Sequence, residues 1–174
     1  MGELTPKSPD YIAGHTSQQT HDDIAELLER LRRRPEIEAV SLSQNSYPYN
    51  GSNSGAEVSY DTLRSPGWTI RRLVTPDFPR VFRYRGTRGE TPEQLAEMLE
   101  RGEFMASDNL YRKYDRRMTD LVGQRFYLFG DTTKTYRLGA ALQNVRYHDY
   151  DQARSSYSMM VKQSFYYIGL ELCV

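Results

Sequence analysis

Two arginines in the middle of the chain carry the most informative chemistry in this sequence. The segment Val81-Phe82-Arg83-Tyr84-Arg85 alternates in side-chain character, which predicts a strand with Val81, Arg83 and Arg85 on one face. Two guanidinium groups that project together suit a bidentate grip on phosphate or carboxylate. In the alternative interpretation, one arginine faces solvent and the other pairs with a nearby glutamate.

A resemblance to a known family gives these arginines a specific role. Val81–Tyr84, followed by Thr91–Leu95 and then Arg101–Phe104, resembles the opening of the bacterial mono-ADP-ribosyltransferase toxins of the cholera and pertussis type. In that family a strand ending in aromatic-Arg precedes a Pro-rich turn, a short helix and a Gly-Phe stop. The resemblance implies that Arg83 contacts NAD, the cofactor that this family uses as a substrate. A register shift of two residues would give this role to Arg85.

The resemblance also implies further NAD-binding residues. Tyr84 and Gly86 adjoin the arginines in the first block, and Tyr84 or Tyr127 would offer a face for nicotinamide. A second stretch, Phe126–Tyr136, is similar to the family's next block, a strand and a Ser-Thr-Ser turn that braces the NAD site. By this resemblance Asp131, Thr132 and Thr133 form the brace.

The late part of the chain departs from the family. Tyr166–Leu172 is similar to the family's following strand, so the resemblance covers residues 81–174, but no Glu-x-Glu or Gln-x-Glu follows. That carboxylate stabilises the oxocarbenium-like transition state, a role that neutral side chains fill poorly. Glu171, the only late glutamate, is therefore the candidate catalytic acid beside Arg83, with Asp149 and Asp151 as alternatives.

These observations leave three interpretations of function. The first is a divergent mono-ADP-ribosyltransferase-like protein, a toxin or effector, that transfers ADP-ribose from NAD to a protein target. The second is a catalytically inactive relative that acts by protein–protein binding. The third is a fragment that ends before its acid. Outside the resemblance, an unrelated α+β binding module, including a binder of single-stranded nucleic acid, stays open as an alternative.

The elements that would position these residues begin after an N-terminal arm. Residues 1–19 are rich in Ser, Thr, Gln and Pro and show no hydrophobic period, which predicts a mobile arm. Thr20 is a plausible N-cap for a helix whose apolar residues recur at helical spacing from Ile24 to Leu31, and Pro35 ends it. A short strand is predicted over residues 36–42.

The second half of the chain contains the clearest start of a helix. A long loop is predicted over residues 43–54, where turn-forming residues dominate. Further on, Thr91 is an N-cap, Pro92 takes the first helical position and Gln94 completes a capping box. Gly102 is the predicted C-terminal stop.

The last elements are predicted from apolar spacing. A strand over residues 125–129 enters a turn at Gly130-Asp131, and Asp131 or Thr132 caps a predicted helix. That helix would carry Tyr136, Leu138, Ala141, Leu142 and Val145. A final, largely buried strand is predicted over residues 164–173. Since helices and strands mix without regular βαβ alternation, residues 20–174 are predicted to form one α+β domain, and the resemblance implies a mixed split sheet.

Composition restricts the partners. The 174 residues contain 23 Lys+Arg and 23 Asp+Glu. This zero formal charge argues against a uniformly basic surface, so nucleic acid is not an expected partner, although a local basic patch remains open. No apolar run approaches the roughly 20 residues of a membrane span, and no membrane partner is expected. The three histidines stand at no metal-ligand spacing, so no metal is expected either.

The N-terminus and the cysteine content bear on localisation. Residues 1–6 lack the basic and apolar regions of a secretory signal, and the single cysteine, Cys173, forms no internal disulfide. We expect a soluble protein that is cytoplasmic, or an effector exported without a classical signal peptide.

Overall fold

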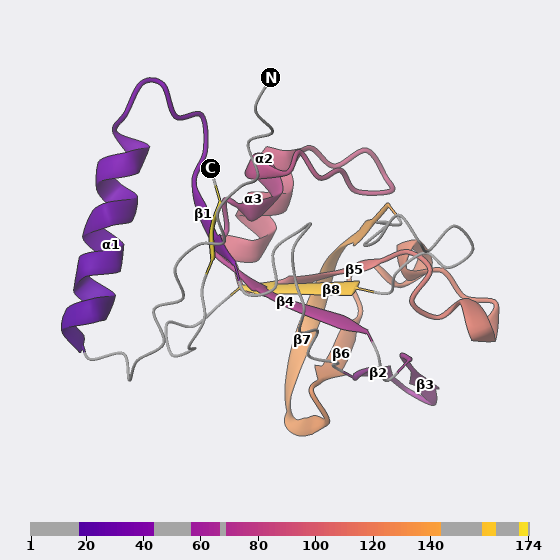
Figure 1. The fold of residues 1–174 in the computed structure, drawn as a ribbon. Coiled ribbons are helices and arrows are strands. Elements are labelled where there is room, and N and C mark those ends of the chain that lie inside the picture. Colours follow the sequence, from indigo (N-terminus) through magenta and orange to yellow (C-terminus); the bar gives the residue numbers. More distant parts are fainter. Residues whose placement is uncertain (1–17, 44–56, 67–68, 144–157, 163–170, 174) are drawn as a thin grey trace, which may run out of the picture.

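Short helices pack on a mixed β-sheet in an α+β arrangement (Figure 1). The computed structural model describes residues 18–43, 57–66, 69–143, 158–162 and 171–173. The helices are α1 (Gln18–Arg32), α2 (Phe78–Val81) and α3 (Pro92–Glu100), with the 3₁₀ turns η1 (Arg112–Tyr114) and η2 (Met118–Leu121). The strands are β1 (Ser41–Ser43), β2 (Val58–Tyr60), β3 (Leu63–Arg64), β4 (Ile70–Val74), β5 (Phe104–Ser107), β6 (Arg125–Leu128), β7 (Asp131–Leu142), β8 (Ser158–Lys162) and β9 (Glu171–Cys173).

The described strands follow the spatial order β3-β2-β6-β7-β5-β8-β4-β1-β9. Strand β4 runs parallel to β8 and β5 runs parallel to β7, while the other neighbouring pairs are antiparallel. The long strand β7 joins two halves of this arrangement, because its first residues pair with β6 and its last residues pair with β5. The sequence-based expectation of an α+β fold is confirmed.

Two hydrophobic clusters fill the core. One contains Phe78 of α2 and Leu95 and Leu99 of α3, which pack on Met105 of β5 and Val74 of β4. The other is formed by thirteen buried residues of β2, β4–β8 and the segment that precedes β6, among them Phe104, Phe126 and Tyr111. Burial of one such large side chain stabilises the fold by about 1.5–3 kcal/mol. The core strands are therefore the fixed frame on which exposed side chains are displayed.

Helix α1 packs through a separate, smaller cluster. Leu28 meets Val40 and Leu42 on the segment that leads into and through β1. The predicted helix is confirmed, but it begins at Gln18, so Thr20 lies inside the helix and is not its N-cap. The predicted strand over residues 36–42 is shorter and later, at Ser41–Ser43. No helix among the described residues is long and apolar enough to cross a membrane.

Helix α3 begins and ends where local chemistry predicts. The Thr91 side chain accepts a hydrogen bond from the Gln94 N–H at 3.3 Å, and the Gln94 side chain accepts one from the Thr91 N–H at 2.9 Å. This capping box satisfies two amide donors of the first turn. At the other end, Gly102 has a φ of 80°, the left-handed conformation that glycine adopts at low cost.

The predicted strand over residues 81–85 is wrong. Asp77 and Pro79 start the short helix α2, and Arg83 follows it in a left-handed turn with a φ of 53°. The ring of Phe82 packs 4.6 Å from Phe78, and the Tyr84 ring stacks 6.0 Å from it. The aromatic side chains therefore fold back on one another, and this packing overrides the alternating pattern.

The predicted helix after Asp131 is also wrong, because these residues form β7. Phe129 and Gly130, with φ values of 62° and 73°, make a two-residue turn that joins β6 to β7. Positive φ at both central positions is the conformation of a type I′ hairpin, whose twist matches that of the flanking strands. The threonines that follow are β-branched and favour a strand. The predicted strand over residues 125–129 is confirmed as β6, Arg125–Leu128.

Some predictions concern residues outside the described part of the chain. These are nearly all of the arm over residues 1–19, almost all of the loop over 43–54 and residues 164–170 of the last predicted strand. Asp149 and Asp151 also lie there. The end of the predicted final strand is described as β9, which pairs antiparallel with β1.

Candidate functional site

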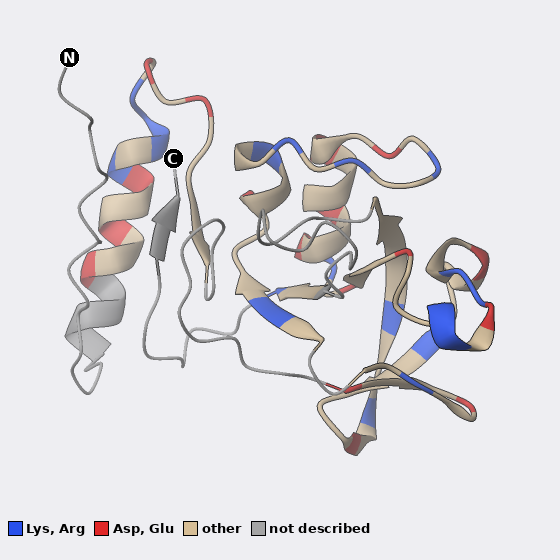
Figure 2. Cartoon of the chain, turned by 45° about the vertical axis from the view of Figure 1, so that its right-hand side comes forward, with Lys and Arg blue, Asp and Glu red and all other residues tan. Residues whose placement is uncertain are grey.

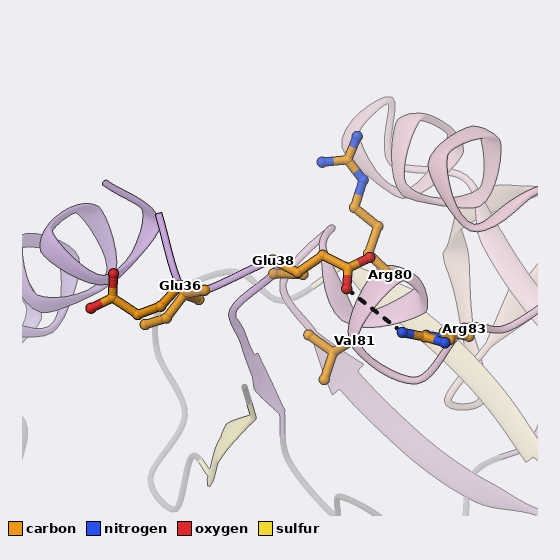
Figure 3. A pocket seen from close by; sticks show the side chains of 7 residues that line it. Glu36, Glu38, Arg80, Val81 and Arg83 are labelled. Carbon is orange, nitrogen blue, oxygen red and sulfur yellow. Dashed lines mark ion pairs between the residues drawn. The ribbon is translucent and has the colours of Figure 1, made fainter. Parts of the chain in front are cut away.

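The arginine that the resemblance assigned to NAD lies at the edge of a small pocket of about 360 Å³ (Figure 3). The Arg83 guanidinium is 3.6 Å from the Glu38 carboxylate, and their side chains are 81% and 88% exposed. Two acids and two arginines line the pocket, namely Glu36, Glu38, Arg80 and Arg83. The other lining residues are Ile37, Ala39 and Val81. The charges of these lining residues balance, so this pocket offers little net attraction to a diphosphate.

The neighbours of Arg83 have structural contacts. The Tyr84 hydroxyl accepts a hydrogen bond from the buried Arg72 guanidinium at 2.9 Å. Gly86 bridges to Leu142 at the end of β7, and the Glu90 side chain packs so closely over Gly86 that any Cβ would collide with it. Arg85 is exposed.

The predicted brace lies at the start of β7, where it stabilises its own turn. The Asp131 carboxylate accepts hydrogen bonds from the Thr133 hydroxyl at 2.6 Å and from the Thr133 N–H at 2.8 Å. These bonds hold the pKa of Asp131 below its usual range. Thr132 is exposed beside them.

The structure does not bring these two predicted blocks together. Asp131 and Leu142 are the two ends of β7, a span of roughly 35 Å for an extended strand of this length. Gly86 lies beside Leu142, whereas the β6–β7 turn lies at the other end (Figure 1). Glu171 is on β9, opposite Ser43 of β1, and its side chain is not described.

A second cavity is larger and of different character. It has a volume of about 1020 Å³ and lies where the β6–β7 hairpin leaves the main sheet. Six of its lining residues are cations and one is an acid: Arg71, Arg101, Arg125, Lys134, Arg137, Lys162 and Glu103. Leu73, Gly102, Phe129, Thr135, Tyr136 and Val161 complete it. We call this cavity the basic groove. In Figure 2, Lys and Arg positions mark the strands β4, β6 and β7 that border it.

The curl of the sheet makes the groove concave. Three strands separate β4 from β6 in the sheet, yet the Arg71 guanidinium of β4 lies 5.6 Å from the ring centre of Phe129, which follows β6. Arg125 pairs in register with Arg137, and Tyr127 pairs with Thr135. Directly paired residues share a face of the hairpin, so both arginines project from the same side.

Glu103 organises the centre of the groove. Its nearly buried carboxylate lies 2.8 Å from the Arg137 guanidinium and 3.4 Å from that of Arg101. A Cβ on Gly139 of β7 would come within 2.5 Å of the Glu103 carboxylate and 3.3 Å of the Met98 Cβ. Glycine at this position therefore allows the carboxylate to lie flat against β7.

Two cations of the hairpin, Arg125 and Lys134, have uncharged partners. Arg125 donates to the Thr135 hydroxyl at 3.3 Å, and the Lys134 ammonium lies 4.7 Å from the ring centre of Tyr136. At the opposite rim, Lys162 pairs with the Glu100 carboxylate at 3.1 Å. Among the described residues, neither Arg125 nor Lys134 forms an ion pair, although Lys134 interacts electrostatically with Asp131. The guanidinium and the ammonium group therefore remain available to an anion.

Sequence reasoning missed the basic groove because its cations come from five separate segments. Each contributes one or two charges, and none forms a run. The one local signal was the alternation of exposed and buried side chains along β6, where Arg125 is exposed and Phe126 is buried. This alternation stops at the turn, because residues 131–135 of β7 are all exposed, so no period marked β7 as a strand.

Comparisons with known proteins leave the site to be interpreted from its geometry. No family model matches the chain, and no curated protein matches it. Among the described residues, no group of three His, Cys, Asp or Glu side chains is placed to hold a metal ion.

Proposed function

We propose that this protein binds a phosphate-bearing nucleotide ligand in the basic groove. The observation that carries this proposal is the convergence of six cations and two aromatic rings on one concave surface whose described lining includes a single carboxylate. Guanidinium groups bind phosphate oxygens through paired N–H donors, and aromatic faces accept the planar base.

The lining residues would contribute to ligand binding in different ways. Arg125 and Lys134 supply positive charge that forms no ion pair among the described residues, although the Asp131 carboxylate is close enough to Lys134 to interact with it electrostatically. Phe129 is 39% exposed and presents its ring beside Arg71. Glu103 holds Arg101 and Arg137 in place, so a ligand meets guanidinium groups whose orientation is already fixed.

NAD is one ligand of this chemistry, and mono-ADP-ribosyl transfer from NAD to a protein is the catalytic form of the proposal. Two observations favour it. Asp131 and Thr133 lie at the start of β7, a strand that borders the basic groove, and the described sheet is mixed, as the resemblance leads us to expect. Transfer would require a carboxylate at the nicotinamide ribose, and Glu103 is the one that the described lining offers.

Calorimetric titration with NAD, ADP-ribose and pyrophosphate tests the proposal. The double variant Arg125→Gln with Lys134→Gln removes two groove charges without leaving a carboxylate unpaired. Its matched control, Arg83→Gln with Arg85→Gln, removes two charges from the first block of the resemblance. We expect the groove variant to lose binding and the control to retain it. If the control variant lost binding and the groove variant retained it, the ligand would bind at Arg83 and the assignment to the basic groove would be wrong.

Nicotinamide release separates catalysis from binding. Nicotinamide release by the wild type that Glu103→Gln abolishes would support cleavage of the glycosidic bond in the groove. ADP-ribose that becomes covalently bound to an added protein would support transfer, whereas free ADP-ribose would indicate hydrolysis. Ligand binding without release would support the catalytically inactive alternative, which acts by binding alone.

A further inference from the structure

We infer that the ligand class of the basic groove is single-stranded nucleic acid; this inference rests on the proposed binding of phosphate-bearing nucleotides there. The groove's extent is the first reason. Its lining residues come from, or directly adjoin, five neighbouring strands, in the order β6, β7, β5, β8 and β4. Four spacings of about 4.8 Å give an arc of roughly 19 Å along the sheet. A surface of this length offers contacts to several successive nucleotides.

The second reason is that the groove is open. Small-molecule pockets typically bury about 70–90% or more of their ligand. Here the side chains of Arg101 and Arg137 are 56% and 54% exposed even though both pair with Glu103. Lys134 and Thr135 are exposed as well. Such a shallow surface suits a chain that enters at one end and leaves at the other.

The third reason is the placement of aromatic rings among the cations. The Arg71 guanidinium over the Phe129 ring forms a stack that a base extends, since guanidinium planes and aromatic rings both stack on bases. Tyr127 is 39% exposed, and its register with Thr135 puts its ring on the groove-bordering face of the hairpin. Only unpaired bases expose their faces to such rings, so a single strand fits and a duplex does not.

The zero formal charge of the chain does not oppose this inference. Phosphates respond to the local field, and the described lining places six cations around one acid. If Arg125, Lys134 and Arg137 each contact one phosphate, log K falls with log salt with a slope of about −2 for a single strand.

Fluorescence anisotropy with labelled oligo-dT and oligo-U tests the inference on the full chain. Lengths of about 2, 4, 8 and 12 nucleotides bracket the site sizes of single-strand binders. We expect affinity to rise with length until the groove is filled, with the salt slope given above. A duplex with the same dT strand should bind more weakly.

Two variants locate the binding. Arg125→Gln with Lys134→Gln should weaken oligonucleotide binding on the order of tenfold at low salt and make the salt slope about 1.4 less negative. Phe129→Gly should weaken it roughly tenfold. Glycine suits the φ of 62° at this position, so the hairpin is retained. Circular dichroism checks the fold of each variant, and Arg83→Gln with Arg85→Gln is the charge-matched control.

The outcomes separate this inference from the proposal on which it rests. If pyrophosphate or NAD binds the groove but oligonucleotide affinity does not rise with length, the ligand is a small nucleotide and the inference is wrong. If neither class binds, both statements fail. The inference is overturned if single-stranded oligonucleotides bind equally well to the wild type and to the groove variant. It is also overturned if the protein binds the duplex more tightly than the single strand.

Discussion

Replacing Glu103 with glutamine changes two measurable properties of the protein in opposite directions. The carboxylate is nearly buried, and both of its arginine partners are about half exposed. In the variant, water can therefore supply part of the hydrogen bonding that Arg101 and Arg137 lose. Because glutamine keeps an acceptor of the same size, we expect the free energy of unfolding to fall by about 1 kcal/mol. For a chain of this length, the melting temperature then falls by about 2–4 °C.

The same change strengthens the attraction to anions. A phosphate about 8 Å from the Glu103 carboxylate is repelled by about 0.5 kcal/mol at the dielectric constant of water, and by about 2 kcal/mol at an effective value of 20. Because the glutamine amide oxygen still accepts a hydrogen bond from the Arg137 guanidinium, we expect that group to keep its orientation. Removal of the charge then raises the affinity for a phosphate-bearing ligand between about twofold and thirtyfold at low salt. The gain shrinks as added salt screens the groove.

The assay pairs urea denaturation with anisotropy titration of an oligonucleotide at two salt concentrations. Glu100→Gln is the matched control, because it removes the same charge at the rim, where the side chain is 66% exposed. It should leave stability nearly unchanged and raise affinity less than the change at Glu103 does. A folded Glu103→Gln protein whose low-salt affinity is unchanged or weaker would refute the electrostatic reasoning for the basic groove.

Three further changes test the fold. Thr91→Ala removes the capping box of α3 and should lower the free energy of unfolding in urea by about 1 kcal/mol; an unchanged midpoint would contradict it. Tyr111→Phe removes a buried hydrogen bond of 2.9 Å to the Val58 carbonyl and should cost about 1 kcal/mol, measured the same way. Partial burial raises the pKa of Asp108, but hydrogen bonds from Thr119 and Arg117 outweigh it and lower the pKa overall. Stability from Asp108 is thus present above its unfolded pKa, about 3.9, and is lost as pH falls through the lower folded value; melting curves of wild type and Asp108→Asn should converge there.

The parts of the fold that depend on neighbouring residues could be predicted from the sequence. The capping box at Thr91 and Gln94 lies within one helical turn, so its residue types are sufficient evidence. Gly102 likewise ends α3 through its own backbone conformation. The segment after Asp131 was different, because its apolar residues fit a helix as well as a strand. Backbone pairing with β6 and β5 makes this segment a strand, and β5 lies more than 20 residues earlier in the sequence.

The candidate site was harder to predict for the same reason. Arg71 and Phe129 are 58 positions apart in the sequence and meet only because the sheet curls. Conversely, Arg83 and Arg85 looked like a pair on one strand face, but packing of Phe82 on Phe78 turned their segment into a helix end. No local pattern encodes either outcome.

The two halves of β7 differ in local stability. Residues 138–142 are buried in the core, whereas all but one of residues 131–137 are exposed. Of these, Asp131 and residues 135–137 pair with β6, and the register shifts between them. Amide hydrogens along this single strand should therefore exchange with solvent over a wide range of rates, slowest near Leu138 and fastest at the turn. The exposed half of the hairpin can then fluctuate and adjust to a ligand while the buried residues 138–142 stay in place.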